Sequence, residues 1–152
     1  RPDFWARALY YLGRAYEDNG DSEKAYTTYR EHNTVQPWTN YQFYGRYRMA
    51  QLKLREFRHR NDSTAWRSVE EAFVDAIQSP FGDGLWRREP YYHLVWFHCE
   101  LAHWARCWAW AQAALATPPI DYSRMPLFLE PVLYDEAWFR AMAAAALGNL
   151  KN

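Results

Sequence analysis

The chain has 152 residues, of which 49% are hydrophobic and 19% aromatic, which is enough for one domain with a core. Equal numbers of basic and acidic residues give a formal net charge of zero, so no overall field attracts nucleic acid or an anionic membrane. No segment resembles an export signal, so we expect a cytoplasmic location.

A helix, a turn and a second helix are predicted for residues 3–37. In the first helix, apolar residues recur at i, i+3 and i+7, which is one face of a helix: Leu9, Leu12 and Tyr16. Asn19-Gly20 then breaks the chain. Either Asp21 or Ser22 can cap the second helix, because both side chains accept a hydrogen bond from a free backbone N–H.

Small and aromatic residues are placed where these two helices are expected to meet. Gly13 and Ala25 allow a close approach, while Tyr16 and Tyr29 fill the space between the helices. This order closely resembles the tetratricopeptide repeat, a helix-turn-helix of about 34 residues. Only His32 stands where that family usually has a small residue. The resemblance implies an all-α fold, a right-handed α-solenoid of about seven helices.

Similar hairpins are predicted along the rest of the chain, approximately over residues 39–79 and 89–117, with half a unit at 133–152. Thr39 and Gln42 are placed as a capping box. Ser63 or Thr64 is expected to cap the following helix. Pro118-Pro119 opens a longer non-helical connection. No stretch alternates with period two, so no sheet is expected.

The last predicted helix, residues 134–147, reaches a turn at Gly148-Asn149 with no second helix to cover it. A repeat unit cannot bury its apolar face alone. We therefore expect residues 1–152 to form a single helical domain that is a segment of a longer protein.

A narrower resemblance extends over nearly the whole chain. Its most distinctive part is Leu127-Phe128-Leu129-Glu130-Pro131 followed by Tyr134. The other segments that carry it are Ala8–Tyr16, Gly20-Asp21, Lys24-Ala25, Trp38, Tyr44, Met49–Lys53, Glu89–Tyr92, Trp108–Ala111, Ala113–Leu115 and Pro118-Pro119. Together they resemble the helical region that follows the catalytic domain of bacterial and phage family 2 glycosyltransferases.

That resemblance implies a parent protein that transfers a sugar from a nucleotide-sugar. Its divalent metal would be held by an acidic motif in the catalytic domain. The present segment has no Asp-x-Asp motif and no Gly-rich phosphate loop. We therefore expect neither a cofactor nor catalysis in this segment.

The cysteines raise the question of a zinc site. Cys99, His103 and Cys107 are four residues apart, with His98 adjacent, and thiolates with imidazoles suit zinc. The repeat pattern, however, puts a turn near His103 and places Cys107 on the small-residue packing stripe. We therefore expect core packing, two reduced thiols and no metal. The same region, residues 91–116, is apolar but is interrupted by three histidines and two charged residues, so no membrane span is expected.

Positive charge is concentrated along the third predicted helix, on Arg46, Arg48, Lys53, Arg55, Arg58 and Arg60. A basic stripe can bind phosphates. The neutral chain, with Glu56 and Asp62 nearby, instead favours a solvated face or a docking face for an acidic neighbour domain. No nucleic-acid partner is expected.

The main candidate for binding is the concave groove that the first helix of each repeat lines. The residues expected to face it are Arg7, Tyr10, Arg14, Glu17, Tyr44, Tyr47, Tyr91 and Trp96. Their aromatic rings suit stacking on a sugar or gripping a peptide. The alternative is core packing with scattered exposed aromatics.

The sequence therefore predicts a non-catalytic scaffold or accessory module attached to a family 2 glycosyltransferase. It would pack on that catalytic domain or present a carbohydrate acceptor. The alternative is a stand-alone adapter whose groove binds a peptide or a partner helix. No catalytic constellation is present in the segment, which leaves open whether the parent protein is an enzyme.

Overall fold

The computed structural model describes residues 2–35, 38–60, 62–79, 87–118 and 136–152. Within these ranges the chain is all-helical, with seven α-helices, one short 3-10 turn and no strand. It divides into two compact units, unit 1 at residues 1–83 and unit 2 at residues 84–152.

Unit 1 consists of two helical hairpins. Its elements are α1 (Pro2–Asp18), α2 (Ser22–His32), α3 (Asn40–His59), a 3-10 turn (Ser63–Ala65) and α4 (Trp66–Ile77). Helix α1 packs on α2, α3 packs on α4, and α2 also packs on α3. The all-α prediction is confirmed.

A tight turn joins α1 to α2. Gly20 has a φ of +79°, in the left-handed region that glycine enters without steric cost. The Asp21 carboxylate then accepts a hydrogen bond from the Lys24 backbone N–H at 3.0 Å. Of the two caps predicted for this helix, Asp21 is the one used.

Glycines allow side chains of α2 to fit against both neighbouring helices. A Cβ on Gly13 of α1 would lie 2.7 Å from Cζ of Tyr29, whose ring is fully buried. A Cβ on Gly45 of α3 would lie 2.7 Å from Nδ1 of His32, which is fully buried as well. Gly13 therefore allows the predicted close approach, and Gly45 makes room for the unusual histidine.

The start of α3 follows the predicted pattern, whereas the start of α4 does not. The Thr39 backbone N–H donates to Gln42 Oε1 at 2.6 Å, and the Thr39 hydroxyl caps α3, which confirms the capping box. Before α4, Asp62 accepts hydrogen bonds from the Thr64 backbone and hydroxyl at 3.0 and 2.6 Å. The predicted Ser63 or Thr64 cap is wrong, because the Asp62 carboxylate engages Thr64 first and starts a 3-10 turn.

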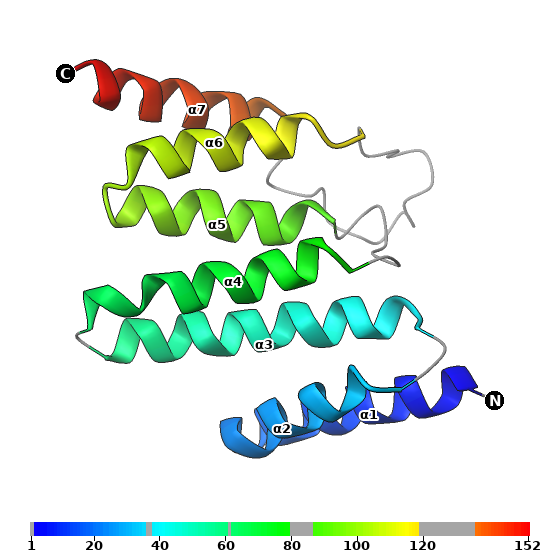
Figure 1. Cartoon of the computed structure of the whole chain (residues 1–152). Helices are drawn as coiled ribbons and strands as arrows, with labels where there is room; N and C mark the ends of the chain where they lie inside the picture. Colours follow the sequence, from blue (N-terminus) through cyan, green and yellow to red (C-terminus); the bar gives the residue numbers. More distant parts are fainter. Residues whose placement is uncertain (1, 36–37, 61, 80–86, 119–135) are drawn as a thin grey trace. The chain divides into compact units, whose positions relative to one another are not determined.

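Unit 2 contains α5 (Arg88–Glu100), α6 (Trp104–Leu115) and α7 (Glu136–Lys151). Helix α6 lies between α5 and α7 (Figure 1). Its core combines small and large side chains: Val95, Cys107, Ala111, Ala114, Phe139, Ala143 and Ala146. The small residues let the three helices pack closely.

A buried arginine joins the ends of these helices. Arg88, 2% exposed, donates through Nε to the Thr117 hydroxyl at 3.2 Å and through Nη2 to the Pro118 carbonyl at 3.3 Å. The same guanidinium lies 3.6 Å from the Glu136 carboxylate at the start of α7. These contacts satisfy a charge that would be costly to bury alone.

The end of the chain differs from the prediction. Gly148 lies inside α7, which continues to Lys151, so the predicted turn at Gly148-Asn149 is wrong. A single glycine is tolerated in a helix that the surrounding residues favour. The predicted motif at residues 127–131 and Tyr134 lies outside the described residues.

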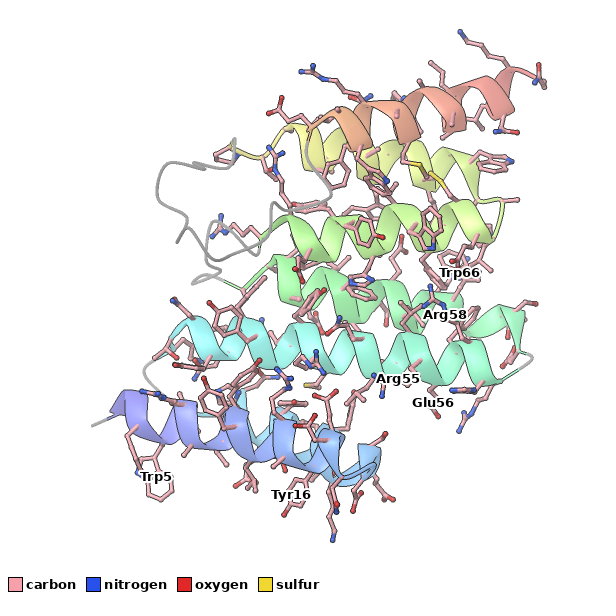
Figure 2. The ribbon with its side chains drawn as sticks, turned by 180° about the vertical axis from the view of Figure 1, so that it is seen from behind. Trp5, Tyr16, Arg55, Glu56, Arg58 and Trp66 are labelled. Atoms are coloured by element: carbon pink, nitrogen blue, oxygen red, sulfur yellow. A yellow bond between two sulfur atoms is a disulfide. The ribbon has the colours of Figure 1, made fainter. Side chains whose placement is uncertain are left out.

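The two cysteines form a disulfide, visible as the yellow bond in Figure 2, so the prediction of reduced thiols is wrong. Ala102 has a φ of +58° and reverses the chain between α5 and α6, at the predicted turn. This reversal brings the Cα atoms of Cys99 and Cys107 to 5.5 Å, within disulfide range. The bridge uses both thiols that the zinc hypothesis needed. Disulfides persist mainly in oxidising compartments, so the bridge does not support the expected cytoplasmic location.

Candidate functional site

Four tyrosines from α1 and α3 form a continuous group, here called the tyrosine cluster: Tyr10, Tyr11, Tyr41 and Tyr44. The ring of Tyr10 lies 5.3 Å from Tyr11, 5.7 Å from Tyr41 and 5.8 Å from Tyr44, measured between centroids. Tyr41 also lies 6.2 Å from Tyr11 and 5.9 Å from Tyr44. All these pairs are tilted or edge-on, which is the favourable geometry for aromatic rings.

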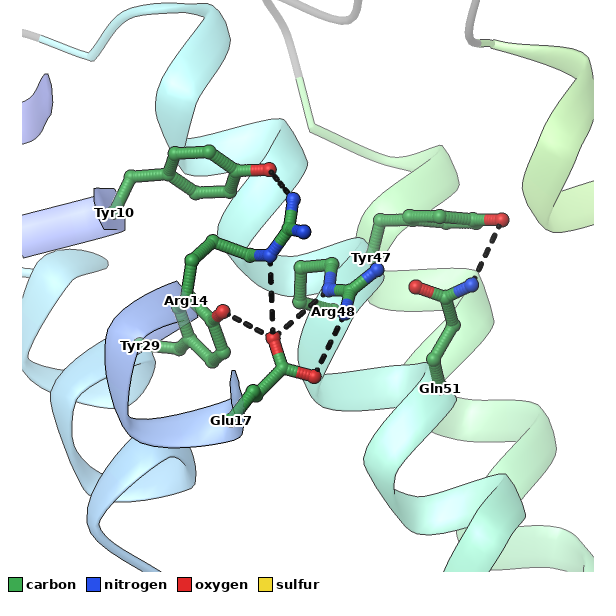
Figure 3. A network of polar contacts seen from close by, with 7 residues as sticks. All are labelled: Tyr10, Arg14, Glu17, Tyr29, Tyr47, Arg48 and Gln51. Atoms are coloured by element: carbon green, nitrogen blue, oxygen red, sulfur yellow. Dashed lines mark hydrogen bonds and ion pairs between the residues drawn. The ribbon is translucent and has the colours of Figure 1, made fainter. Parts of the chain in front are cut away.

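Beside the cluster, three helices meet at one carboxylate (Figure 3). Arg48 of α3 donates to Glu17 of α1 through Nε and Nη2, both at 2.9 Å. The Tyr29 hydroxyl of α2 donates to the same carboxylate. Arg14 Nε lies 3.9 Å away, and Arg14 Nη1 donates to the Tyr10 hydroxyl at 3.3 Å. We call these five residues the Glu17 network.

Burial decides what the Glu17 network can do. The Glu17 side chain is only 4% exposed, and both of its oxygens accept hydrogen bonds. Burial and the hydrogen bond to Glu17 raise the pKa of Tyr29 far above its usual range, so its hydroxyl stays a donor. This carboxylate is therefore buried and engaged by the arginine and tyrosine donors of the protein. The network holds three helices in register and fixes the Tyr10 ring, rather than acting as a general base.

The exposed side of the site is aromatic and cationic. Tyr11 is 53% exposed, and the Arg7 guanidinium lies 5.9 Å from the centroid of its ring. The Arg14 side chain is 38% exposed, yet its Nε makes no hydrogen bond. The hydrogen bond from Nη1 to Tyr10 raises the pKa of Arg14, which therefore stays charged. Rings and guanidinium groups are thus presented together on one surface.

The structure brings some of the predicted binding residues together. Arg7, Tyr10, Arg14, Glu17 and Tyr44 all belong to the tyrosine cluster or the Glu17 network, or lie against them. Glu17 lies beneath the surface.

The remaining three candidates belong to neither the tyrosine cluster nor the Glu17 network. Tyr47 stacks on Phe43 at 6.4 Å and accepts a hydrogen bond from Gln51 at 3.2 Å. Tyr91 and Trp96 are on α5 in unit 2, where Tyr91 packs on Trp110 at 6.1 Å. Trp96 is 43% exposed.

Four members of the site were not among the predicted binding residues. They complete the surface and its support, and they are Tyr11, Tyr29, Tyr41 and Arg48. Tyr41, Tyr44 and Arg48 recur at i, i+3 and i+7, so they share one face of α3. That spacing is the signal that would have grouped them.

The described residues contain no group of three or more His, Cys, Asp and Glu that could hold a metal. The same part of the chain has no helix long and apolar enough to cross a membrane. No family model, curated protein or solved structure matches the chain.

Proposed function

We propose that the chain is a non-catalytic helical scaffold of the tetratricopeptide type, and that the tyrosine cluster with Arg7 and Arg14 is its binding surface. In this proposal the hairpins continue as a right-handed solenoid. Support for it comes from unit 1, where α2 packs on both α1 and α3, the order in which such repeats stack.

The observation that carries the binding proposal is the support beneath the tyrosine cluster. Hydrogen bonds from α2 and α3 converge on the Glu17 carboxylate of α1, and Arg14 beside it donates to the Tyr10 hydroxyl. Rings that are already held in place lose little conformational entropy when a ligand binds. A rigid, half-exposed aromatic surface with guanidinium donors suits a flat, hydroxyl-rich ligand.

The scaffold is proposed to serve a family 2 glycosyltransferase, presenting its carbohydrate acceptor on the tyrosine cluster. This step depends on the resemblance carried by segments such as Ala8–Tyr16 and Glu89–Tyr92. The runner-up is an adapter that binds a peptide on the same surface, because aromatic rings with arginines also grip peptides.

A titration with a panel of oligosaccharides, followed by calorimetry, tests the binding surface. Tyr11→Ala is expected to weaken binding about tenfold, the equivalent of about 1.4 kcal/mol. Trp5→Ala is the matched control. Trp5 is an exposed aromatic residue on the same helix, and its side chain points away from α3 (Figure 2). Equal losses in both variants would contradict the assignment of the surface. Binding of peptides alone would favour the adapter.

Reading the coding sequence upstream of Arg1 tests the attachment. A nucleotide-sugar domain with an Asp-x-Asp motif is the expected result. Further helical repeats in its place would contradict the link to a glycosyltransferase and leave the adapter.

A further inference from the structure

A groove of about 730 Å³ lies between α2 and α3 in unit 1, away from the tyrosine cluster. Helix α2 contributes Tyr26 and Arg30 to it, four residues apart and therefore on one face. Helix α3 contributes Leu52, Lys53 and Arg55, and Arg60 follows the helix as its C-cap residue. We call this feature the basic groove. It shares no residue with the tyrosine cluster or the Glu17 network.

The basic groove concentrates charge within a neutral chain. Four of its side chains are cationic, whereas two, Glu23 and Glu56, are acidic. Glu56 is already paired with Arg60 at 2.7 Å. Arg55 is exposed and makes no ion pair within the described part of the chain. An excess of positive charge therefore remains, and it attracts an anionic partner.

One aromatic ring lies where the cations of the two helices converge. The Arg30 guanidinium lies 5.9 Å and the Lys53 ammonium 5.7 Å from the centroid of the Tyr26 ring. Leu52, only 7% exposed, provides an apolar surface beside them. Each helix thus positions one cation over the same ring, which holds both side chains near the groove.

The distribution of charge favours one kind of ligand. The cations of the groove are spread over two helices, with Arg30 on α2 and Lys53 and Arg55 on α3. Carboxylates on alternate residues of an extended peptide are spaced by about 7 Å, so one peptide can pair with several of these cations, whereas a diphosphate is more compact. In addition, the Asp21 carboxylate caps the N-terminus of α2 at one end of the groove, which disfavours a phosphate there.

We propose that the basic groove binds an extended, acidic peptide segment whose carboxylates pair with Lys53, Arg55 and Arg30. An apolar residue of that segment would contact Leu52 and Tyr26. The site is additional to the proposed carbohydrate surface, and neither site depends on the other.

Fluorescence anisotropy with the full chain tests this proposal. The probe is a fluorescein-labelled, Glu-rich peptide with one central leucine, and the control peptide has Gln at each Glu. The acidic peptide is expected to bind, and its affinity should fall as ionic strength rises. The Gln peptide is expected to bind at least tenfold more weakly.

Variants then locate the site. Lys53→Glu with Arg55→Glu is expected to weaken binding at least tenfold. The matched control is Arg67→Glu with Lys151→Glu, which makes the same charge change at two exposed positions outside the groove. Circular dichroism checks that both variants fold, and Arg55→Gln provides a milder test. Tyr11→Ala should leave peptide binding unchanged, which separates this site from the carbohydrate surface.

Several results would overturn the proposal. The wild-type chain could fail to bind the acidic peptide, or the groove variant and its control could lose the same affinity. Tighter binding of a nucleoside diphosphate or a short oligonucleotide in the groove would also overturn it, because the ligand would then belong to another class.

Discussion

At the scale of single residues, Glu17 shows how a charge can be kept beneath the surface. Arg48 is bidentate to its carboxylate, and Tyr29 adds a third hydrogen bond. Removing one partner of a buried pair usually costs more than the pair contributes, because the other charge stays buried without compensation.

Arg48→Ala is therefore expected to lower the free energy of unfolding by about 2–3 kcal/mol, somewhat below the usual cost for fully buried pairs. The reduction reflects the Arg48 side chain, which is 24% exposed. Urea denaturation followed by circular dichroism measures the change. Arg55→Ala, at an exposed position on the same helix, is the control and should cost less than about 0.5 kcal/mol. Similar losses in both variants would contradict the role given to the Glu17 network.

His32 leads to a prediction of pH dependence. Its ring is fully buried, neither nitrogen has a hydrogen-bond partner, and burial lowers its pKa from 6.5 to about 4. The folded state therefore holds the ring neutral, while the unfolded chain takes up a proton below pH 6.5. The full free energy of unfolding is therefore present above that pH. It falls by up to about 3 kcal/mol as the pH drops towards about 4.

His32→Leu should flatten this part of the stability curve, because it removes the titrating ring and keeps an apolar side chain near Gly45. Urea midpoints measured at several pH values for both proteins test it. An unchanged difference between wild type and variant across the acidic range would show that His32 does not titrate as described.

At the scale of elements, the contact between α1 and α2 depends on the absence of a side chain at Gly13. Alanine favours a helix over glycine by about 1 kcal/mol. At Gly13 the new Cβ would overlap the buried Tyr29 ring. We expect Gly13→Ala to destabilise the protein by about 1–3 kcal/mol, because the overlap outweighs the gain in propensity.

Gly148 provides the matched control within α7, since an added Cβ there meets nothing within 4 Å. Gly148→Ala should stabilise the protein by about 0.5 kcal/mol, at the low end of the propensity difference because it lies near a helix end. Opposite signs in thermal melts are the expected result. Stabilisation by both variants would mean that the contact between Gly13 and Tyr29 is looser than described.

At the scale of the whole molecule, the features that could be predicted from the sequence are those that depend on a few neighbouring residues. The capping box of Thr39 and Gln42 and the turn at Ala102 follow from a few neighbouring residues, and both are present. The pair of Glu17 and Arg48 joins residues 31 apart, which no helical period relates. The proposed binding surface was therefore predicted only in part, because its support comes from contacts between helices.

The cysteines show the same limit. A spacing of eight residues indicates one helix face if the helix continues, and a bridged pair if the chain reverses between them. The reversal was predicted, but its effect on Cys99 and Cys107 follows only once α6 is placed against α5. Pattern alone therefore identified the turn and missed the bond.

Because the chain divides into two compact units, loss of the disulfide is expected to lower the stability of only one of them. The bridge lies wholly in unit 2 and closes a loop of about nine residues, for which chain entropy gives about 2–3 kcal/mol of stabilisation. Reduction should therefore lower the protection of amides in α5 and α6 against hydrogen exchange, while amides in α1 and α2 keep theirs. Mass spectrometry of the exchanged peptides, with and without reductant, measures both regions at once. In the double variant Cys99→Ala with Cys107→Ala, amide protection should match that of the reduced protein and should not change when reductant is added. An equal loss of protection in both units would show that they unfold together, because a local bridge would then stabilise the whole chain.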